Sequence, residues 1–162
     1  MQRVAVGMLG LGVVGSGVLR LLSEHGDRIA KRCGRRVEVA RAAVRDLSKA
    51  RKATIPTGLT LSQDPWSVVD DPSISVVIET MGGIHPAREL VLKALSSGKD
   101  VVTANKALLA EHGPELFEEA RVHGRALSFE ASVGGGIPIV QALEVGLAAN
   151  AIQSISAIVN GT

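Results

Sequence analysis

The sequence predicts an α/β fold, with a doubly wound, mostly parallel sheet and helices on both faces. Apolar runs of strand length alternate with segments of helical periodicity along the whole chain. Hydrophobic residues make up 46% of the 162 positions and aromatic residues only 2%, so valine, leucine, isoleucine and alanine must build the core. That composition is typical of a buried parallel sheet. The length suits one domain with its own core.

The expected elements follow from periodicity and from the positions of proline and glycine. Strands are expected at residues 4–9, 37–44, 74–79, 100–103, 126–129 and 152–159. Helices are expected from Gly12 to about Ala30, at 66–69, at 86–97 with Gly98 as its C-cap, at 115–123 after Gly113-Pro114, and at 138–149. Residues 45–63 are expected to form a short helix and a loop, and the glycines at 134–136 a flexible loop.

A glycine-rich motif, Gly10-Leu11-Gly12-Val13-Val14-Gly15, follows the first strand and opens the first helix. Gly10 permits a tight turn, Gly12 lets the backbone approach a pyrophosphate, and Gly15 allows close packing of helix on strand. The free N–H groups of the helix N-terminus favour an anion there. The motif in this context predicts a Rossmann-type fold that binds a dinucleotide with these six residues, and a glycine-rich packing turn is the alternative.

The end of the second strand bears on the choice of cofactor. It reads Val44-Arg45-Asp46, and Lys49 and Arg51 follow closely. A basic residue here suits the 2′-phosphate of NADP, whereas an acidic residue suits the ribose hydroxyls of NAD. Arg45 and Lys49 favour NADP, and Asp46 leaves NAD open.

Three further loops are expected at the carboxyl ends of the strands, where ligands of open α/β sheets bind. They begin at Glu79-Thr80, Thr103-Ala104-Asn105-Lys106 and Glu130. Lys106 could polarise a carbonyl or hold an alkoxide, although a surface lysine at a helix start is an equal alternative. Glu79 and Glu130 are expected to form pairs or bind a cation. The four histidines are expected at the surface, because their spacing fits no metal site.

Composition excludes several classes of function. The formal charge of +2 is scattered along the chain, and few aromatic residues are available for base stacking, so nucleic-acid binding is not expected. The longest apolar run is interrupted by glycines, so no membrane span is expected. Cys33 is the only cysteine, which excludes an intrachain disulfide and fits a reducing cytoplasm.

Five blocks of sequence resemble the homoserine dehydrogenase family in order and spacing. They are residues 10–17 (GLGVVGSG), 77–83 (VIETMGG), 101–107 (VVTANKA), 129–139 (FEASVGGGIPI) and 158–162 (IVNGT). The Thr-Ala-Asn-Lys and Glu-Ala-Ser-Val-Gly-Gly-Gly-Ile-Pro blocks are far more specific than the glycine motif.

The resemblance implies NAD(P)-dependent interconversion of L-homoserine and L-aspartate 4-semialdehyde, in threonine, methionine and isoleucine biosynthesis. It implies that Arg45 contacts the 2′-phosphate, and that Thr80, Thr103 and Lys106 lie at the nicotinamide or in the active site. Asn105 is also expected to bind the cofactor, and Lys106 is the expected catalytic residue. The resemblance also implies a monovalent cation, such as Na+, held by Glu130, Val133, Gly135 and Ile137.

The expected organisation is a dinucleotide-binding domain over residues 1–150 and, at 151–162, the start of a truncated substrate and dimerisation domain. The family's second lysine and its homoserine-binding acids would lie beyond residue 162. We therefore expect this chain to bind NADP(H) without turning over homoserine, and the full-length enzyme to be a homo-oligomer.

Two alternatives remain. Sugar or polyol dehydrogenases also place a lysine after a strand, but usually within Glu-Lys-Pro, whereas this chain has Asn105-Lys106-Ala107. A non-catalytic nucleotide-sensing module is the other alternative, and the intact motifs on all the cleft loops count against it.

Overall fold

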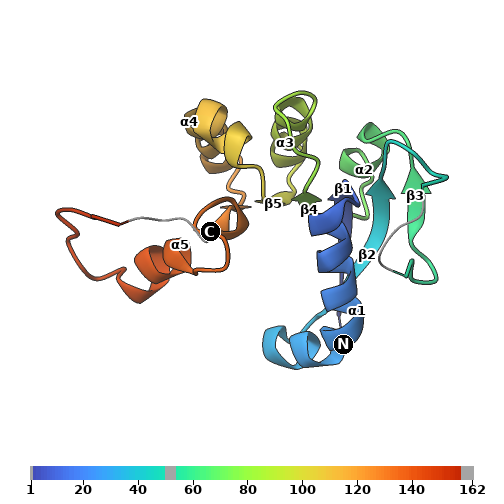
Figure 1. Cartoon of the computed structure of the whole chain (residues 1–162), viewed down its shortest axis with the longest axis horizontal. Helices are drawn as coiled ribbons and strands as arrows, with labels where there is room; N and C mark the ends of the chain where they lie inside the picture. Colours follow the sequence, from blue (N-terminus) through green and yellow to red (C-terminus); the bar gives the residue numbers. More distant parts are fainter. Residues whose placement is uncertain (1, 50–53, 158–162) are drawn as a thin grey trace.

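A computed structural model describes residues 2–49 and 54–157 and places one sheet of six strands between two layers of helices (Figure 1). The strands are β1 (Arg3–Leu9), β2 (Arg36–Ala43), β3 (Thr60–Ser62), β4 (Val76–Glu79), β5 (Asp100–Thr103) and β6 (Leu127–Ser128). Their order is β3-β2-β1-β4-β5-β6, and every neighbouring pair is parallel. The predicted doubly wound α/β fold is therefore confirmed. The strand order reverses between β1 and β4.

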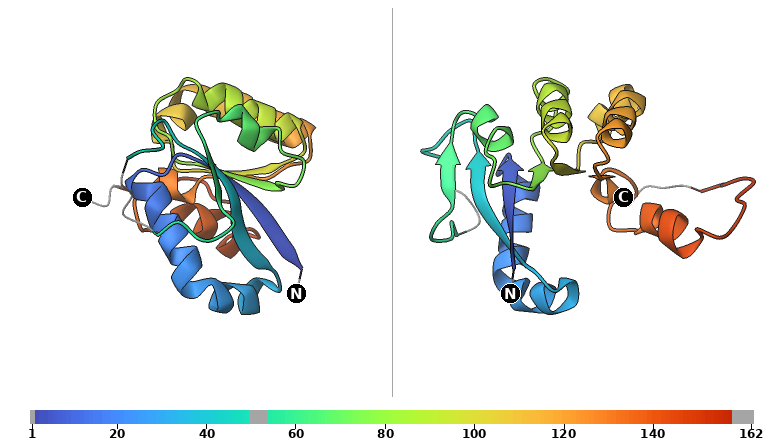
Figure 2. Two further views of the ribbon diagram at one scale, coloured as in Figure 1. Left: turned by 90° about the vertical axis from the view of Figure 1, so that its right-hand side faces the viewer. Right: turned by 180° about the vertical axis from the view of Figure 1, so that it is seen from behind.

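Helices cover both faces of the sheet (Figure 2). Helix α1 (Val13–Cys33) lies on one face, and α2 (Trp66–Val69), α3 (Ala87–Ser96) and α4 (Lys106–Val122) lie on the other. After β6 come a 3-10 turn η1 (Glu130–Ser132), the short helix α5 (Ile139–Gln141) and a π-helical turn η2 (Ala142–Gly146). This C-terminal part extends away from the sheet.

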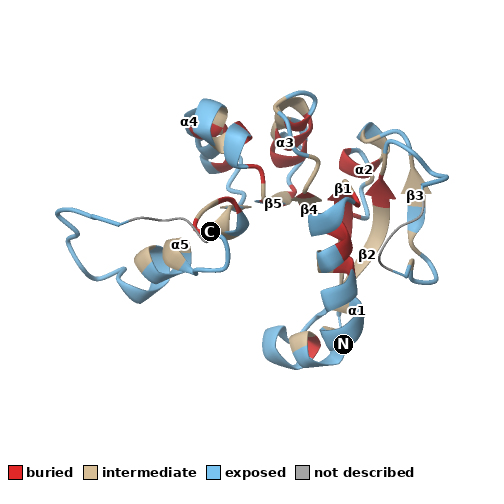
Figure 3. Ribbon diagram, viewed as in Figure 1, coloured by how far each residue is buried: buried red, intermediate tan, exposed pale blue. Residues whose placement is uncertain are grey.

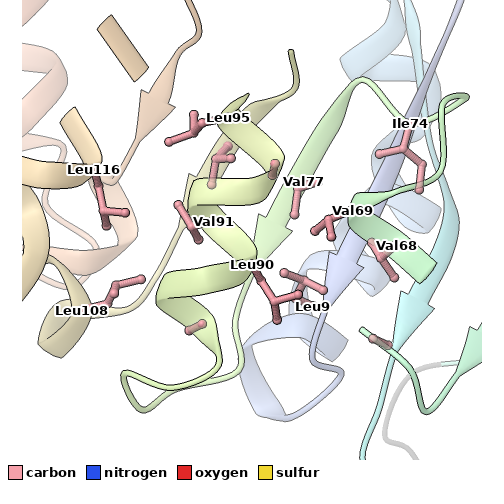
Figure 4. Close-up of a cluster of buried hydrophobic side chains, with 14 of the residues drawn as sticks. Leu9, Val68, Val69, Ile74, Val77, Leu90, Val91, Leu95, Leu108 and Leu116 are labelled. Carbon is pink, nitrogen blue, oxygen red and sulfur yellow. The ribbon is translucent and has the colours of Figure 1, made fainter. Parts of the chain in front are cut away.

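Two apolar cores hold the layers together, because side chains alternate across each strand. Leu9 of β1 belongs to the larger core, which lies beneath α2, α3 and α4 and also contains Val77, Leu90 and Leu116 (Figure 4). Its neighbour Met8 faces the other way and packs with Leu19 of α1. The buried residues follow the sheet and the inner faces of these helices, whereas the C-terminal part is mostly exposed (Figure 3).

Helix α4 begins nine residues earlier than expected. The sequence placed a helix start at 115, after Gly113-Pro114, but the helix begins at Lys106 and contains Pro114. Asn105 caps it by accepting the N–H of Leu108 at 3.2 Å. The buried Leu108 and Leu116 pack on α3 from both sides of the proline, so tertiary packing outweighs its local penalty.

Residues 45–63 were expected to contain a short helix, and that prediction was wrong for the part that the structure describes. Thr60–Ser62 form β3, which pairs with Arg41–Ala43 of β2. The pairing partner lies some twenty residues earlier in the chain, so local propensity did not reveal the strand. Residues 50–53, including Arg51, lie outside the described residues.

The ends of other elements differ more modestly. Helix α1 continues past Ala30 to Cys33, where Gly34 adopts a left-handed φ of 72° and caps it. Ser97, not Gly98, is the C-cap of α3. The strand expected at 126–129 is reduced to Leu127–Ser128.

The elements expected after residue 137 are largely corrected. The helix predicted for 138–149 consists of α5 and η2, which end at Gly146. Residues 152–157 form no strand, because no neighbouring strand offers them hydrogen bonds there, and residues 158–162 lie outside the described residues. Throughout 2–49 and 54–157, no helix is both long and apolar enough to cross a membrane.

Candidate functional site

A cavity of about 780 Å³ opens at the carboxyl ends of β1, β2 and β4, where the strand order reverses. Crevices at such reversal points are the ligand sites of open α/β sheets. The cavity brings together most of the residues predicted to bind the cofactor: Gly10, Leu11, Gly12, Val13, Arg45, Lys49 and Thr80. Val14, Gly15, Thr103, Asn105 and Lys106 are not on its wall.

The glycine motif makes a tight turn against the loop that follows β4. Gly10 has a φ of +97°, which favours glycine, and its carbonyl accepts the hydroxyl of Thr80 at 2.9 Å. A Cβ added to Gly15 would lie 2.3 Å from the Gly10 carbonyl oxygen. A Cβ added to Gly12 would meet no atom within 4 Å, so the backbone at Gly12 is open to the cavity.

The N-terminus of α1 points its unsatisfied N–H groups toward this opening. Gly12 is the N-cap and supplies no side-chain cap, and the first turn holds no acidic residue. Val13 is 77% exposed, so no side chain of the described residues covers the entrance there. Such a helix end attracts an anion by its free donors and its dipole.

Two basic residues and one acid surround the end of β2. Arg45, Asp46 and Lys49 all line the cavity and are exposed. The carbonyl of Arg45 accepts the side-chain amide of Gln63 at 3.1 Å, which fixes the backbone of this loop. Asp46 accepts the N–H and the hydroxyl of Ser48 at 2.8 and 2.7 Å. The arrangement presents positive charge at the end of the cavity nearest β2.

Thr103 and Asn105 turn inward instead of toward the cavity. The hydroxyl of Thr103 donates to the Glu79 carboxylate at 2.6 Å, and the Asn105 side chain donates to the carbonyl of Gly83 at 2.6 Å. Glu79 therefore pairs through hydrogen bonds, which was one of the two expectations for it. These side chains tie the loops after β4 and β5 together.

Lys106 lines a second, smaller hollow of about 300 Å³. Its other walls come from α4 and from the segment after β6, and they include Phe117, Phe129, Ser132 and Val133. The two phenylalanine rings meet edge to face, with centroids 5.2 Å apart. Lys106 is exposed at the first turn of α4, at the rim of a largely apolar surface.

Glu130 caps the short helix α5. One carboxylate oxygen accepts the N–H of Val140 at 3.0 Å and the other accepts that of Gln141 at 2.8 Å. Between Glu130 and Val140 the chain turns at Gly134 and Gly135, which adopt positive φ angles of 67° and 63°. The part of the chain that the structure describes holds no group of three or more His, Cys, Asp or Glu suited to a metal. Any cation here would depend on Glu130 and backbone carbonyls.

Several cavity residues were not anticipated. Gln63, Pro65, His85 and Pro86 also line the cavity. His85 was expected only at the surface; it is exposed and contacts Glu89 at 2.6 Å, but it also forms part of the wall. The pKa of Glu89 is lowered, first by a hydrogen bond from its own backbone N–H and then by His85. The place of these cavity residues in the sequence, shortly after Gly82-Gly83 or shortly after β3, was the one signal that could have predicted them.

Comparison with known proteins identifies the family. Residues 10–130 match the profile described as the NAD-binding domain of homoserine dehydrogenase. The chain belongs to this family. The homoserine dehydrogenases of Bacillus subtilis and Pseudomonas aeruginosa are 44% and 47% identical to it over its whole length. A crystal structure of the homoserine dehydrogenase from Thiobacillus denitrificans superposes with a TM-score of 0.86 at 51% identity, over 93% of this chain and 34% of that one.

The chain spans about 37% of the length of these two bacterial relatives. It is therefore similar to their NAD-binding part. The family match makes it an NAD-binding domain, in agreement with the resemblance that the sequence motifs showed.

Proposed function

We propose that this chain is the cofactor-binding part of an enzyme that interconverts L-homoserine and L-aspartate 4-semialdehyde. One observation supports the proposal above all: the cavity at the reversal of strand order joins the glycine motif, the basic end of β2 and the loop after β4. A bound nicotinamide dinucleotide would supply hydride chemistry, and the residues of this chain would bind and orient it.

The cofactor we propose is NADP(H), with NAD(H) as a weaker ligand. The pyrophosphate would lie at the open N-terminus of α1, over Gly12. Arg45 and Lys49 would bind the 2′-phosphate, because both line the end of the cavity nearest β2. The nicotinamide half would then extend past Thr80 over β4, β5 and β6.

Lys106 is the catalytic residue that we propose. From the first turn of α4 its ammonium group would stabilise negative charge on the oxygen of the reacting carbon. Thr103 and Asn105 would support it, since Asn105 caps α4 and bonds to Thr103 through its backbone N–H at 3.0 Å.

The residues after β6 fit a monovalent cation such as Na+. A carboxylate has about four acceptor positions, and the two helix N–H groups occupy only two of those of Glu130. The backbone carbonyls of Val133, Gly135 and Ile137 would complete a set of hard oxygen ligands. Thermal unfolding in NaCl and in choline chloride of equal ionic strength tests this: Na+ should stabilise the unaltered chain but not Glu130→Gln. Equal melting temperatures in the two salts would refute the site.

We further propose that residues from 151 onward begin a substrate and dimerisation domain, and that the full-length enzyme is a cytoplasmic homo-oligomer. The exposed Ile137, Val145 and Ile155, at 48%, 70% and 58%, are consistent with further chain packing on this segment.

The decisive experiment uses the full-length enzyme that contains this domain. Lys106→Ala should lower kcat for NADPH-dependent reduction of aspartate semialdehyde by about a hundredfold or more. Lys31→Ala, at the far end of α1, is the control and should leave kcat unchanged. The 162-residue chain should show no turnover of homoserine. A Lys106→Ala enzyme within about threefold of the unaltered rate would refute the catalytic role.

A further inference from the structure

Glu79, the last residue of β4, is a carboxylate with no solvent exposure. Among the described residues, none of the ion pairs includes it. Burial of a carboxylate without a basic partner is unfavourable unless hydrogen bonds replace its hydration. An apolar residue at this position would avoid that cost, so the presence of a carboxylate calls for a role other than core packing.

Hydrogen bonds from Glu79 extend into the loops after two strands. One oxygen accepts the N–H of Met81 at 2.7 Å and the other accepts the hydroxyl of Thr103 at 2.6 Å. That hydroxyl also accepts the N–H of Asn105 at 3.0 Å, and the Asn105 side chain returns to the carbonyl of Gly83. The loop after β4 is thus held at both ends to the loop after β5.

A third loop joins the same network. Ser132, in the turn after β6, donates its hydroxyl to the carbonyl of Thr103 at 2.9 Å. Like Thr103 and Asn105, Ser132 is almost fully buried. The network therefore fixes the loops at the carboxyl ends of β4, β5 and β6, with Glu79 as its one charged member.

The network also lies between the two hollows of the site. Met81 lines the large cavity, whereas Ser132 and Lys106 line the small one. In a doubly wound sheet each half binds one mononucleotide, so the β4–β6 half faces the nicotinamide half of the cofactor. The adenosine half faces β1, β2 and β3, and none of the side-chain hydrogen bonds of the network goes to these three strands.

We propose that Glu79 is a positioning residue for the nicotinamide half of the cofactor, acting through Met81 and Thr103 without touching the ligand. The inference rests on the proposed function, since it needs a dinucleotide in the large cavity. The buried carboxylate of Glu79 holds the loop that lines the cavity in a fixed position relative to the loop that precedes α4. Loss of this arrangement should weaken binding of the nicotinamide half and spare the adenosine half.

The test compares two ligands on the 162-residue chain, NADPH and adenosine 2′,5′-diphosphate, the second of which lacks the nicotinamide half. In Glu79→Gln, an amide NH2 that faces the Met81 N–H leaves that N–H without an acceptor, and one that faces Thr103 reverses the hydrogen bond and forces the hydroxyl to donate elsewhere. We expect the Kd for NADPH to rise roughly tenfold, and the Kd for the adenosine ligand to stay within about twofold.

Lys99→Met is the matched control. Lys99 is also a buried charge, and burial lowers the pKa of its ammonium group. It donates to the carbonyls of Asp71 and Ile74, near the amino end of β4, away from the cavity. Its removal should alter stability and leave both affinities unchanged.

A second variant, Thr103→Val, breaks the same hydrogen bond from the other side. If Thr103 acts through Glu79, the double variant, with both Glu79→Gln and Thr103→Val, should have a Kd for NADPH no higher than that of the single variant with the higher Kd. Unchanged NADPH affinity in Glu79→Gln, an equal loss for both ligands, or additive effects in the double variant would each overturn the inference while leaving the proposed function intact. Failure of the unaltered chain to bind either ligand would overturn both.

Discussion

At the scale of single residues, the glycines of the glycine motif have different structural roles. The spacing predicted a tight turn at Gly10 and close packing at Gly15. Both agree with the structure, because Gly10 lies against Thr80 and Gly15 lies against the Gly10 carbonyl and the Thr80 hydroxyl. The identity of the packing partner was not predictable, because Thr80 lies in the loop after β4, some seventy residues later. The same holds for Thr103 and Asn105, whose partners Glu79 and Gly83 become neighbours only when β4 and β5 pair.

Two alanine substitutions should separate these roles. Gly15→Ala should lower the free energy of unfolding by about 1–3 kcal/mol, because its Cβ would lie 2.3 Å from the Gly10 oxygen. Gly12→Ala should leave stability within about 0.5 kcal/mol but weaken NADPH binding at least tenfold, because only a bound pyrophosphate would meet its Cβ. Urea unfolding and NADPH titration measure the two effects.

Gly17→Ala provides the control for both. Gly17 lies in the same helix and is exposed, and a Cβ added there would meet no atom within 4 Å. Alanine at this position should raise stability by about 0.5–1 kcal/mol and leave NADPH affinity unchanged. Equal affinity loss in Gly12→Ala and Gly17→Ala would show that the helix, and not the approach of the pyrophosphate, determines binding.

At the scale of elements, prediction from sequence succeeded where periodicity was long and failed where a partner decided the outcome. The buried strands and helices α1 and α3 were located to within a few residues. Strand β3 was missed because its hydrogen bonds come from β2, and the start of α4 was missed because Gly113-Pro114 is a strong local signal for a helix boundary. In each case tertiary packing outweighed local propensity.

The continuity of α4 can be tested at Pro114. Pro114→Ala should stabilise the chain by about 1–3 kcal/mol, because alanine restores a helical N–H and removes a clash with the preceding turn. Urea unfolding of the variant against the unaltered chain measures this difference. A loss of stability would instead support two helices with a boundary at 115, as the sequence alone indicated.

At the scale of the whole molecule, the all-parallel order β3-β2-β1-β4-β5-β6 explains why the site lies where it does. The reversal between β1 and β4 opens the cavity, and the two halves of the sheet present different chemistry to it. Basic side chains lie beside β2, and a buried hydrogen-bond network lies beneath the ends of β4, β5 and β6. The alternation of strands and helices predicted this layout, whereas the exposed segment after residue 137 was predicted to be more regular than it is.

Calorimetric titration of the 162-residue chain with NADPH and with NADH tests the assignment of the cavity most directly. We expect one NADPH per chain and weaker binding of NADH. Arg45→Ala should raise the Kd for NADPH about tenfold and change that for NADH little, while Arg35→Ala, just before the start of β2, should change neither. Absence of binding by both cofactors, or equal effects of the two arginine substitutions, would contradict the placement of the dinucleotide in this cavity.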